Sequence, residues 1–118
     1  MPLLNISRTT FAGFADATEQ HFIDRTASFL KANVPALAGV SDVELLSNVQ
    51  HVVGKARSYG FVEESDVVRF ALCSALLGLE FDHDFPGARE ILEMKESATY
   101  RADLLEYYTR EIFEALEG

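Results

Sequence analysis

Apolar side chains recur at intervals of three and four residues along nearly the whole chain, and this spacing limits the possible folds more than any other feature. Leu45, Val49, Val52 and Ala56, for example, fall on one face of a helix with 3.6 residues per turn. The alternating pattern of a half-buried strand is almost absent. We therefore predict an all-α fold, an irregular bundle of about five helices in one compact domain over residues 1–118, with a short N-terminal arm at 1–7.

Capping residues and breakers divide this pattern into segments. Ser7 is a candidate cap for the first helix, and Val34-Pro35 stops it, because the residue before proline avoids the helical region. Ser41 and Glu44 form a capping box, and Gly60 is a natural terminator. We expect helices at about 8–31, 42–59, 63–79, 86–92 and 98–116, with a loop over 80–85. The third helix is apolar on most sides and should lie at the centre of the bundle.

The acidic charge is concentrated in the last third of the chain. The formal net charge is −9, of which −7 falls between Glu80 and the C-terminus. Nucleic-acid binding needs a basic footprint, and anionic membranes attract basic surfaces, so the sequence argues against both partners. Two interpretations stay open for the acidic region: a solvated surface, or a field that steers a basic partner.

The cellular compartment is predicted from three features that the sequence does not show. No apolar run approaches the 18 residues of a membrane helix, and the first residues do not resemble a secretory leader. Cys73 is the only cysteine and cannot form an intramolecular disulfide. The sequence therefore predicts a cytoplasmic protein.

Asp82-His83-Asp84, with Glu80 and Glu90 nearby, is the cluster that most resembles a metal site. Carboxylates and an imidazole are potential ligands for a divalent cation. The segment nevertheless lacks the ligand spacing and the glycine of a calcium loop. We favour a solvated acidic connection and predict no metal site, with a cation-binding loop as the alternative.

No pattern of catalytic residues is recognisable. Cys73 has no neighbouring base that would generate a thiolate, and it is better explained as a small buried apolar residue. His21 and His51 lie on different predicted helices without the spacing of a zinc pair. A glycine-rich phosphate loop and a Ser/His/Asp pattern are also absent. We predict that the protein is not an enzyme and uses no cofactor.

Aromatic and basic residues gather at the predicted helix junctions. As a protein-binding surface we consider this set: Arg57, Tyr59, Phe61, Phe81 and Phe85. The alternative is structural, with Tyr59 packed under the turn that Gly60 permits.

Several short motifs resemble one family. They are Phe22-Ile23-Asp24-Arg25 with Phe29-Leu30, Ala56-Arg57-Ser58-Tyr59-Gly60-Phe61, Glu64 to Phe70, Leu77-Gly78-Leu79-Glu80-Phe81-Asp82, and Pro86 to Leu92. Together they are similar to small helical proteins encoded beside effector genes of bacterial type VI secretion systems. The resemblance covers about residues 11–92. Many proteins with this pattern have a tryptophan near the loop-to-helix transition. This chain has no tryptophan, and Gly87 lies close to that place.

The resemblance implies a function through binding. Some of these proteins act as co-chaperones that bind an effector's adaptor chaperone during loading. The partner implied here is therefore another protein, an effector or its adaptor chaperone, while the oligomeric state stays open. A second interpretation is an immunity protein that neutralises a neighbouring toxin, since a small acidic protein suits a basic active site.

Overall fold

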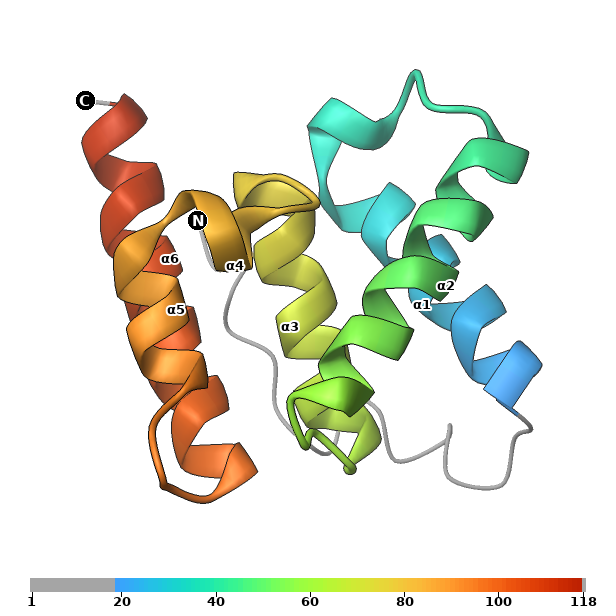
Figure 1. Cartoon of the computed structure of the whole chain (residues 1–118). Coiled ribbons are helices and arrows are strands. Elements are labelled where there is room, and N and C mark those ends of the chain that lie inside the picture. The colour runs from blue at the N-terminus through green and yellow to red at the C-terminus, as the bar shows by residue number, and fades with distance from the viewer. Residues whose placement is uncertain (1–18, 118) are drawn as a thin grey trace.

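The computed structural model describes residues 19–117 and contains no strand within that range. Six α-helices and one short 3-10 helix follow one another along these described residues, so the predicted all-α fold is confirmed (Figure 1). The elements are α1 (Glu19–Asn33), η2 (Pro35–Leu37), α2 (Asp42–Ser58), α3 (Glu64–Leu77), α4 (Phe81–Asp84), α5 (Pro86–Leu92) and α6 (Ala98–Glu117). The predicted arm at 1–7, the cap at Ser7 and the start of the first helix lie outside the described residues.

Helix α3 lies at the centre of the bundle, as its apolar character predicts. Figure 1 shows it between α1 and α2 on one side and the α5–α6 pair on the other. It packs against α1, α2, α4 and α6. Val67, Val68, Phe70, Leu72 and Cys73 are each at most 1% exposed, because neighbouring helices cover α3 on nearly every side.

The predicted boundaries of α1 and α2 depend on local chemistry that the structure reproduces. Val34 has an extended backbone (φ −116°, ψ 101°) before Pro35, and α1 ends there. The Ser41 hydroxyl accepts a 3.2 Å hydrogen bond from the Glu44 amide and caps α2. The serine half of the predicted capping box is therefore present.

Gly60 terminates α2 through a left-handed turn, with φ 93°. The Phe61 amide donates to the carbonyl of Ala56 (3.1 Å), and the Gly60 amide donates to that of Arg57 (2.9 Å). This pair of bonds is the Schellman motif, which is typically accompanied by an apolar contact from the residue after the glycine. The turn therefore directs Phe61 into the core.

The expected loop at 80–85 instead contains the single turn α4, so that prediction is wrong. The Asp84 amide donates to the Glu80 carbonyl at 2.9 Å, and the Phe85 amide donates to that of Phe81 at 3.0 Å. Burial of Phe81 and Asp82 against the bundle holds this turn, which is too short to be stable alone. Pro86 then begins α5, as predicted, because its missing amide has no partner in a first turn.

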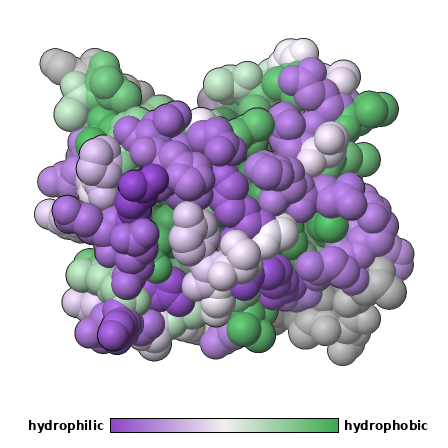
Figure 2. Space-filling model, viewed as in Figure 1, coloured by the Kyte–Doolittle hydropathy of each residue, from purple (hydrophilic) through white to green (hydrophobic). Residues whose placement is uncertain are grey.

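The C-terminal end of α6 extends beyond the core, so its last apolar residues are exposed. Leu105 is buried, but Leu116, near the end of the helix, is 75% exposed. Helix α6 has 20 residues and α3 has 14, so at 1.5 Å per residue α6 is about 9 Å longer than its neighbour. Figure 2 shows a largely hydrophilic surface, with hydrophobic residues gathered near this end of α6.

Within residues 19–117 no helix has the length and apolar character that crossing a bilayer requires.

Candidate functional site

Three of the aromatic side chains predicted to bind a partner form the interior of the α2–α3–α4 junction. Phe61 and Phe81 are 0% exposed, and Tyr59 is half-buried. Their ring centroids lie 5.7, 5.0 and 5.9 Å, respectively, from that of Phe70 on α3. Phe61 and Phe81 therefore present no surface to a partner, which corrects the sequence-based assignment. The apolar position after the glycine of a helix terminator already indicates a core role for Phe61.

Arg57 and Phe85, the other two predicted binding residues, also serve the junction. The Arg57 guanidinium donates to the Val62 carbonyl at 2.6 Å and pairs with the Glu19 carboxylate at 3.0 Å. It thereby ties α2 to the segment after it and to α1. Phe85 is half-buried and packs against the core. The structural alternative thus accounts for the contacts of both side chains.

The most extensive polar network of the junction is built around Asp82 of α4. This carboxylate is 1% exposed, and its Oδ1 accepts a 2.8 Å hydrogen bond from Nζ of Lys55. Its Oδ2 accepts a 2.7 Å hydrogen bond from the Tyr59 hydroxyl. Lys55 also donates to the Leu79 carbonyl (2.8 Å) and to the Glu80 carboxylate (3.0 Å). Lys55 on α2 and Tyr59, the C-cap residue of that helix, thus hold the turn that follows α3.

The network shifts the pKa values of its members. Burial alone would raise the pKa of Asp82, but hydrogen bonds from Lys55 and Tyr59 outweigh it, and the pKa is lowered. Burial alone would lower the pKa of Lys55, but its bonds to Asp82 and Glu80 raise it. Burial and the bond to Asp82 raise the pKa of Tyr59 to about 12. The ion pair therefore persists at neutral pH with a neutral tyrosine beside it.

The same network bears on the cation-binding interpretation of this segment. Glu80, Asp82 and His83 each place one potential ligand atom within 4.8 Å of the others. The Lys55 ammonium already lies against both carboxylates, at 3.0 and 2.8 Å. A divalent cation bound by these groups would have to displace that ammonium. Asp84 and Glu90, the other predicted members of the cluster, are exposed and are not part of this group.

Cys73, His21 and His51 lie on three different helices of the described chain. Cys73 is fully buried, and its Sγ lies 3.8 Å from the Leu105 carbonyl oxygen, to which it donates. Burial raises the pKa of this thiol to about 12, which suppresses the thiolate. His21 and His51 are exposed on α1 and α2, and Nε2 of His51 lies 3.7 Å from the Glu80 carboxylate.

An exposed face of α6 is the surface that sequence reasoning missed. Tyr100 and Tyr107 are 48% and 62% exposed and lie two helical turns apart, about 10 Å along the axis. Asp103, Glu111 and Glu114 are exposed on the same face. We call these five residues the α6 stripe. The seven-residue spacing of the tyrosines was visible in the sequence, but the same spacing also describes a core face.

Comparison with protein-family models, with curated protein sequences and with solved structures gives no match to this chain.

Proposed function

We propose that this protein is a non-enzymatic adaptor that binds another protein, and that it acts as a co-chaperone in the loading of a type VI secretion effector. The observation that carries the binding role is the pair of exposed tyrosines among carboxylates on the α6 stripe. Tyrosine supplies a large contact area at a small cost in side-chain entropy and is enriched at binding hot spots. The secretion context comes from the family resemblance of the junction motifs.

Charge defines the chemistry of the partner. The segment from Glu80 to the C-terminus, which includes the stripe, has a net charge of −7. A basic surface on the partner would be attracted to it over about a Debye length, roughly 8 Å at physiological salt. We therefore propose that the partner presents apolar or aromatic side chains surrounded by lysine or arginine. Such an interface should associate more slowly as salt is added.

The test is co-purification with a type VI secretion effector and its adaptor chaperone from the same cells. The Tyr100→Ser/Tyr107→Ser double variant should bind at least tenfold more weakly, as expected for the loss of hot-spot side chains. The matched control is Val43→Ser/Val62→Ser, which removes two other apolar side chains that are 80% and 76% exposed. Equal weakening by both double variants, or no binding of either protein to the wild type, would contradict the proposal.

The acidity of the same surface favours one alternative, an immunity protein that covers a basic toxin site. The discriminating experiment is co-expression with the neighbouring toxin. An immunity protein restores growth, and the stripe variant loses that protection. A co-chaperone leaves the toxicity unchanged.

A further inference from the structure

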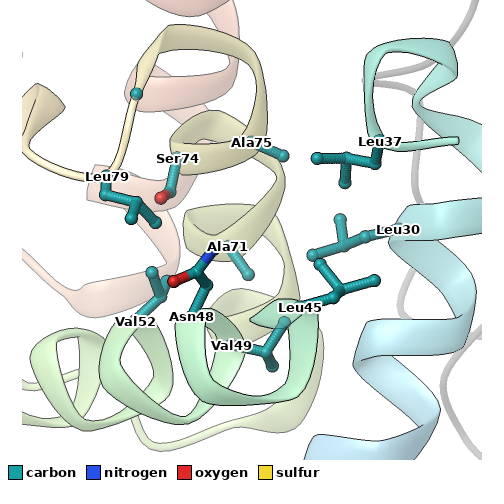
Figure 3. Close-up of a pocket in the computed structure, with 11 residues that line it drawn as sticks. Leu30, Leu37, Leu45, Asn48, Val49, Val52, Ala71, Ser74, Ala75 and Leu79 are labelled. Atoms are coloured by element: carbon teal, nitrogen blue, oxygen red, sulfur yellow. The ribbon is translucent and has the colours of Figure 1, made fainter. Parts of the chain in front are cut away.

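An apolar pocket opens on the side of the bundle formed by α1, η2, α2 and α3. Its volume is about 180 Å³. Figure 3 shows leucine and valine side chains from three directions converging on it. Those that define its walls are Leu30, Leu37, Leu45, Val49 and Leu79. An engineered apolar cavity of roughly 150 Å³ holds a benzene molecule, so this pocket suits a ligand of about six to nine heavy atoms.

Two polar groups face this apolar space. Ser74 on α3 is 3% exposed, and its Oγ makes no hydrogen bond within the described part of the chain. A serine inside a helix ordinarily bonds a carbonyl one turn back, and a buried hydroxyl without a partner is unfavourable. Figure 3 shows this hydroxyl and the Asn48 amide of α2 directed into the pocket. The amide carries both a donor and an acceptor.

The residues around the pocket also define what it excludes. Among the described residues none that lines it carries a formal charge. A charged ligand would lose its hydration without gaining an opposite charge, which is strongly unfavourable. A neutral ligand with one hydrogen-bonding group would satisfy Ser74 and Asn48 while its apolar body fills the space between the leucines.

We propose that this pocket is a binding site for a small, neutral, mainly apolar molecule that carries one hydroxyl, phenol or amide group. The site is separate from the adaptor role proposed above. The pocket is lined by residues of α1, α2 and α3, together with Leu37, Gly78 and Leu79. The stripe lies on α6, which Figure 1 shows on the other side of α3 from α1 and α2. The protein can therefore hold such a ligand and a protein partner at the same time.

The experiment titrates the full chain with phenol and with toluene, which have similar shapes and differ in the hydroxyl. Isothermal calorimetry gives the affinity, and amide chemical shifts locate the site. We expect phenol to bind with a Kd of roughly 0.1–1 mM, as the ligand efficiency of such small molecules allows. Toluene should bind about fivefold more weakly, because it leaves the Ser74 hydroxyl without a partner.

Two variants make the test specific. Ser74→Ala removes only the hydroxyl, so it should fold normally and reduce the preference for phenol from fivefold to about twofold or less, since the Asn48 amide remains. Ser47→Ala, on the exposed face of α2, is the matched control and should keep the fivefold preference. Absence of shifts around Leu30 and Leu45 with both ligands would overturn the proposal, and so would an unchanged preference in Ser74→Ala.

A further variant tests whether the pocket holds this small molecule or a side chain of a protein partner. Ala75→Leu places three additional carbon atoms at the wall of the pocket. It should abolish phenol binding while binding of the protein partner stays within twofold of the wild type. If it abolishes partner binding instead and the wild type binds neither phenol nor toluene, the pocket receives a partner's side chain and the proposal is wrong.

Discussion

Lys55 on α2 donates a 2.8 Å hydrogen bond to the carboxylate of Asp82 on α4, 27 residues further along the chain. The carboxylate is 1% exposed and the lysine side chain 12%, so water screens the pair poorly. The Tyr59 hydroxyl donates a second hydrogen bond to this carboxylate, at 2.7 Å. This contact explains why a segment with three acidic residues in five positions, Glu80 to Asp84, packs against an apolar bundle.

Asp82→Asn should destabilise the protein by about 3 kcal/mol. The substitution leaves the largely buried Lys55 ammonium paired with the more exposed Glu80, and breaking a buried pair typically costs about 3–5 kcal/mol. Urea unfolding followed by circular dichroism measures the change. Asp84→Asn, on an exposed neighbour in the same turn, is the control and should stay within about 0.5 kcal/mol. Similar values for the two variants would show that the Lys55–Asp82 pair contributes little.

The stability that Asp82, Lys55 and Tyr59 contribute together should be lost at both low and high pH. The pKa of Asp82 is lower in the folded protein than its ordinary value of 3.8, so its contribution is full above pH 3.8 and is lost as the pH falls through the folded value. The pKa of Lys55 is raised above 10.5, so its contribution is full below that pH and is lost as the pH rises through the folded value. Tyr59 adds to the alkaline loss as its pKa, raised from 10.0, is passed at about 12.

The measurement is the difference in unfolding free energy between the wild type and Asp82→Asn across the pH range. That difference should be largest near neutrality and should shrink toward both ends. A difference that does not vary with pH would mean that Asp82 acts through shape and not through charge.

Two glycines should respond to alanine in opposite directions. Gly54 lies within α2, and a Cβ there would meet nothing within 4 Å, so Gly54→Ala should stabilise by about 0.5–1 kcal/mol. At Gly87, on α5, a Cβ would lie 2.7 Å from Cζ of Tyr108. Overpacking of this kind typically costs about 1–3 kcal/mol, so Gly87→Ala should destabilise despite the gain in helix propensity.

Thermal unfolding of Gly54→Ala, Gly87→Ala and the wild type checks these opposite effects on stability. Equal changes in Tm would show that the Tyr108 ring moves aside freely.

The thiol of Cys73 should be inert in the folded protein. Burial raises its pKa from 9.0 to about 12, which lowers the thiolate fraction roughly 1000-fold. Labelling by an aromatic disulfide at pH 8 should therefore be at least about 1000-fold slower in buffer than in urea. Comparable rates would reveal frequent opening of the contact between α3 and α6.

The helices were predictable because their signals are local. In α2 the signals are the apolar face of the helix, the cap Ser41 and the terminator Gly60. They lie within 20 residues, and each acts on its own segment. The central place of α3 also follows from its sequence, because a helix that is apolar on most sides must be covered on most sides.

The candidate site was predictable only in part, because its decisive contacts are long-range. Asp82 is polar and adjoins other polar residues, so a solvated loop was the reasonable expectation. Its burial depends on a lysine two helices earlier. Phe61 and Tyr107 show the same limit, since each is an aromatic residue beside a charged or polar segment. Packing buries Phe61 completely and leaves Tyr107 62% exposed.

Arg101 should be among the most sensitive positions of α6, because it closes the end of another helix. Its guanidinium donates to the Leu92 carbonyl (3.0 Å) and to the Glu96 carbonyl (3.2 Å), and it lies 4.9 Å from the centre of the Phe61 ring. The last carbonyls of a helix have no partner within it, and a cation there also favours the helix dipole. Arg101→Met keeps much of the apolar stem and removes these bonds, so it should destabilise by about 3 kcal/mol.

A local measurement separates this capping role from a general loss of stability. In Arg101→Met, hydrogen exchange at the amides of Glu93 and Met94, which bond to carbonyls of α5, should accelerate more than exchange in the centre of α3. Arg110→Met, which removes a more exposed arginine that pairs with Glu106 on the same helix, should change stability by less than about 1 kcal/mol. If Arg101→Met accelerates exchange equally everywhere, Arg101 stabilises the core as a whole and does not close α5.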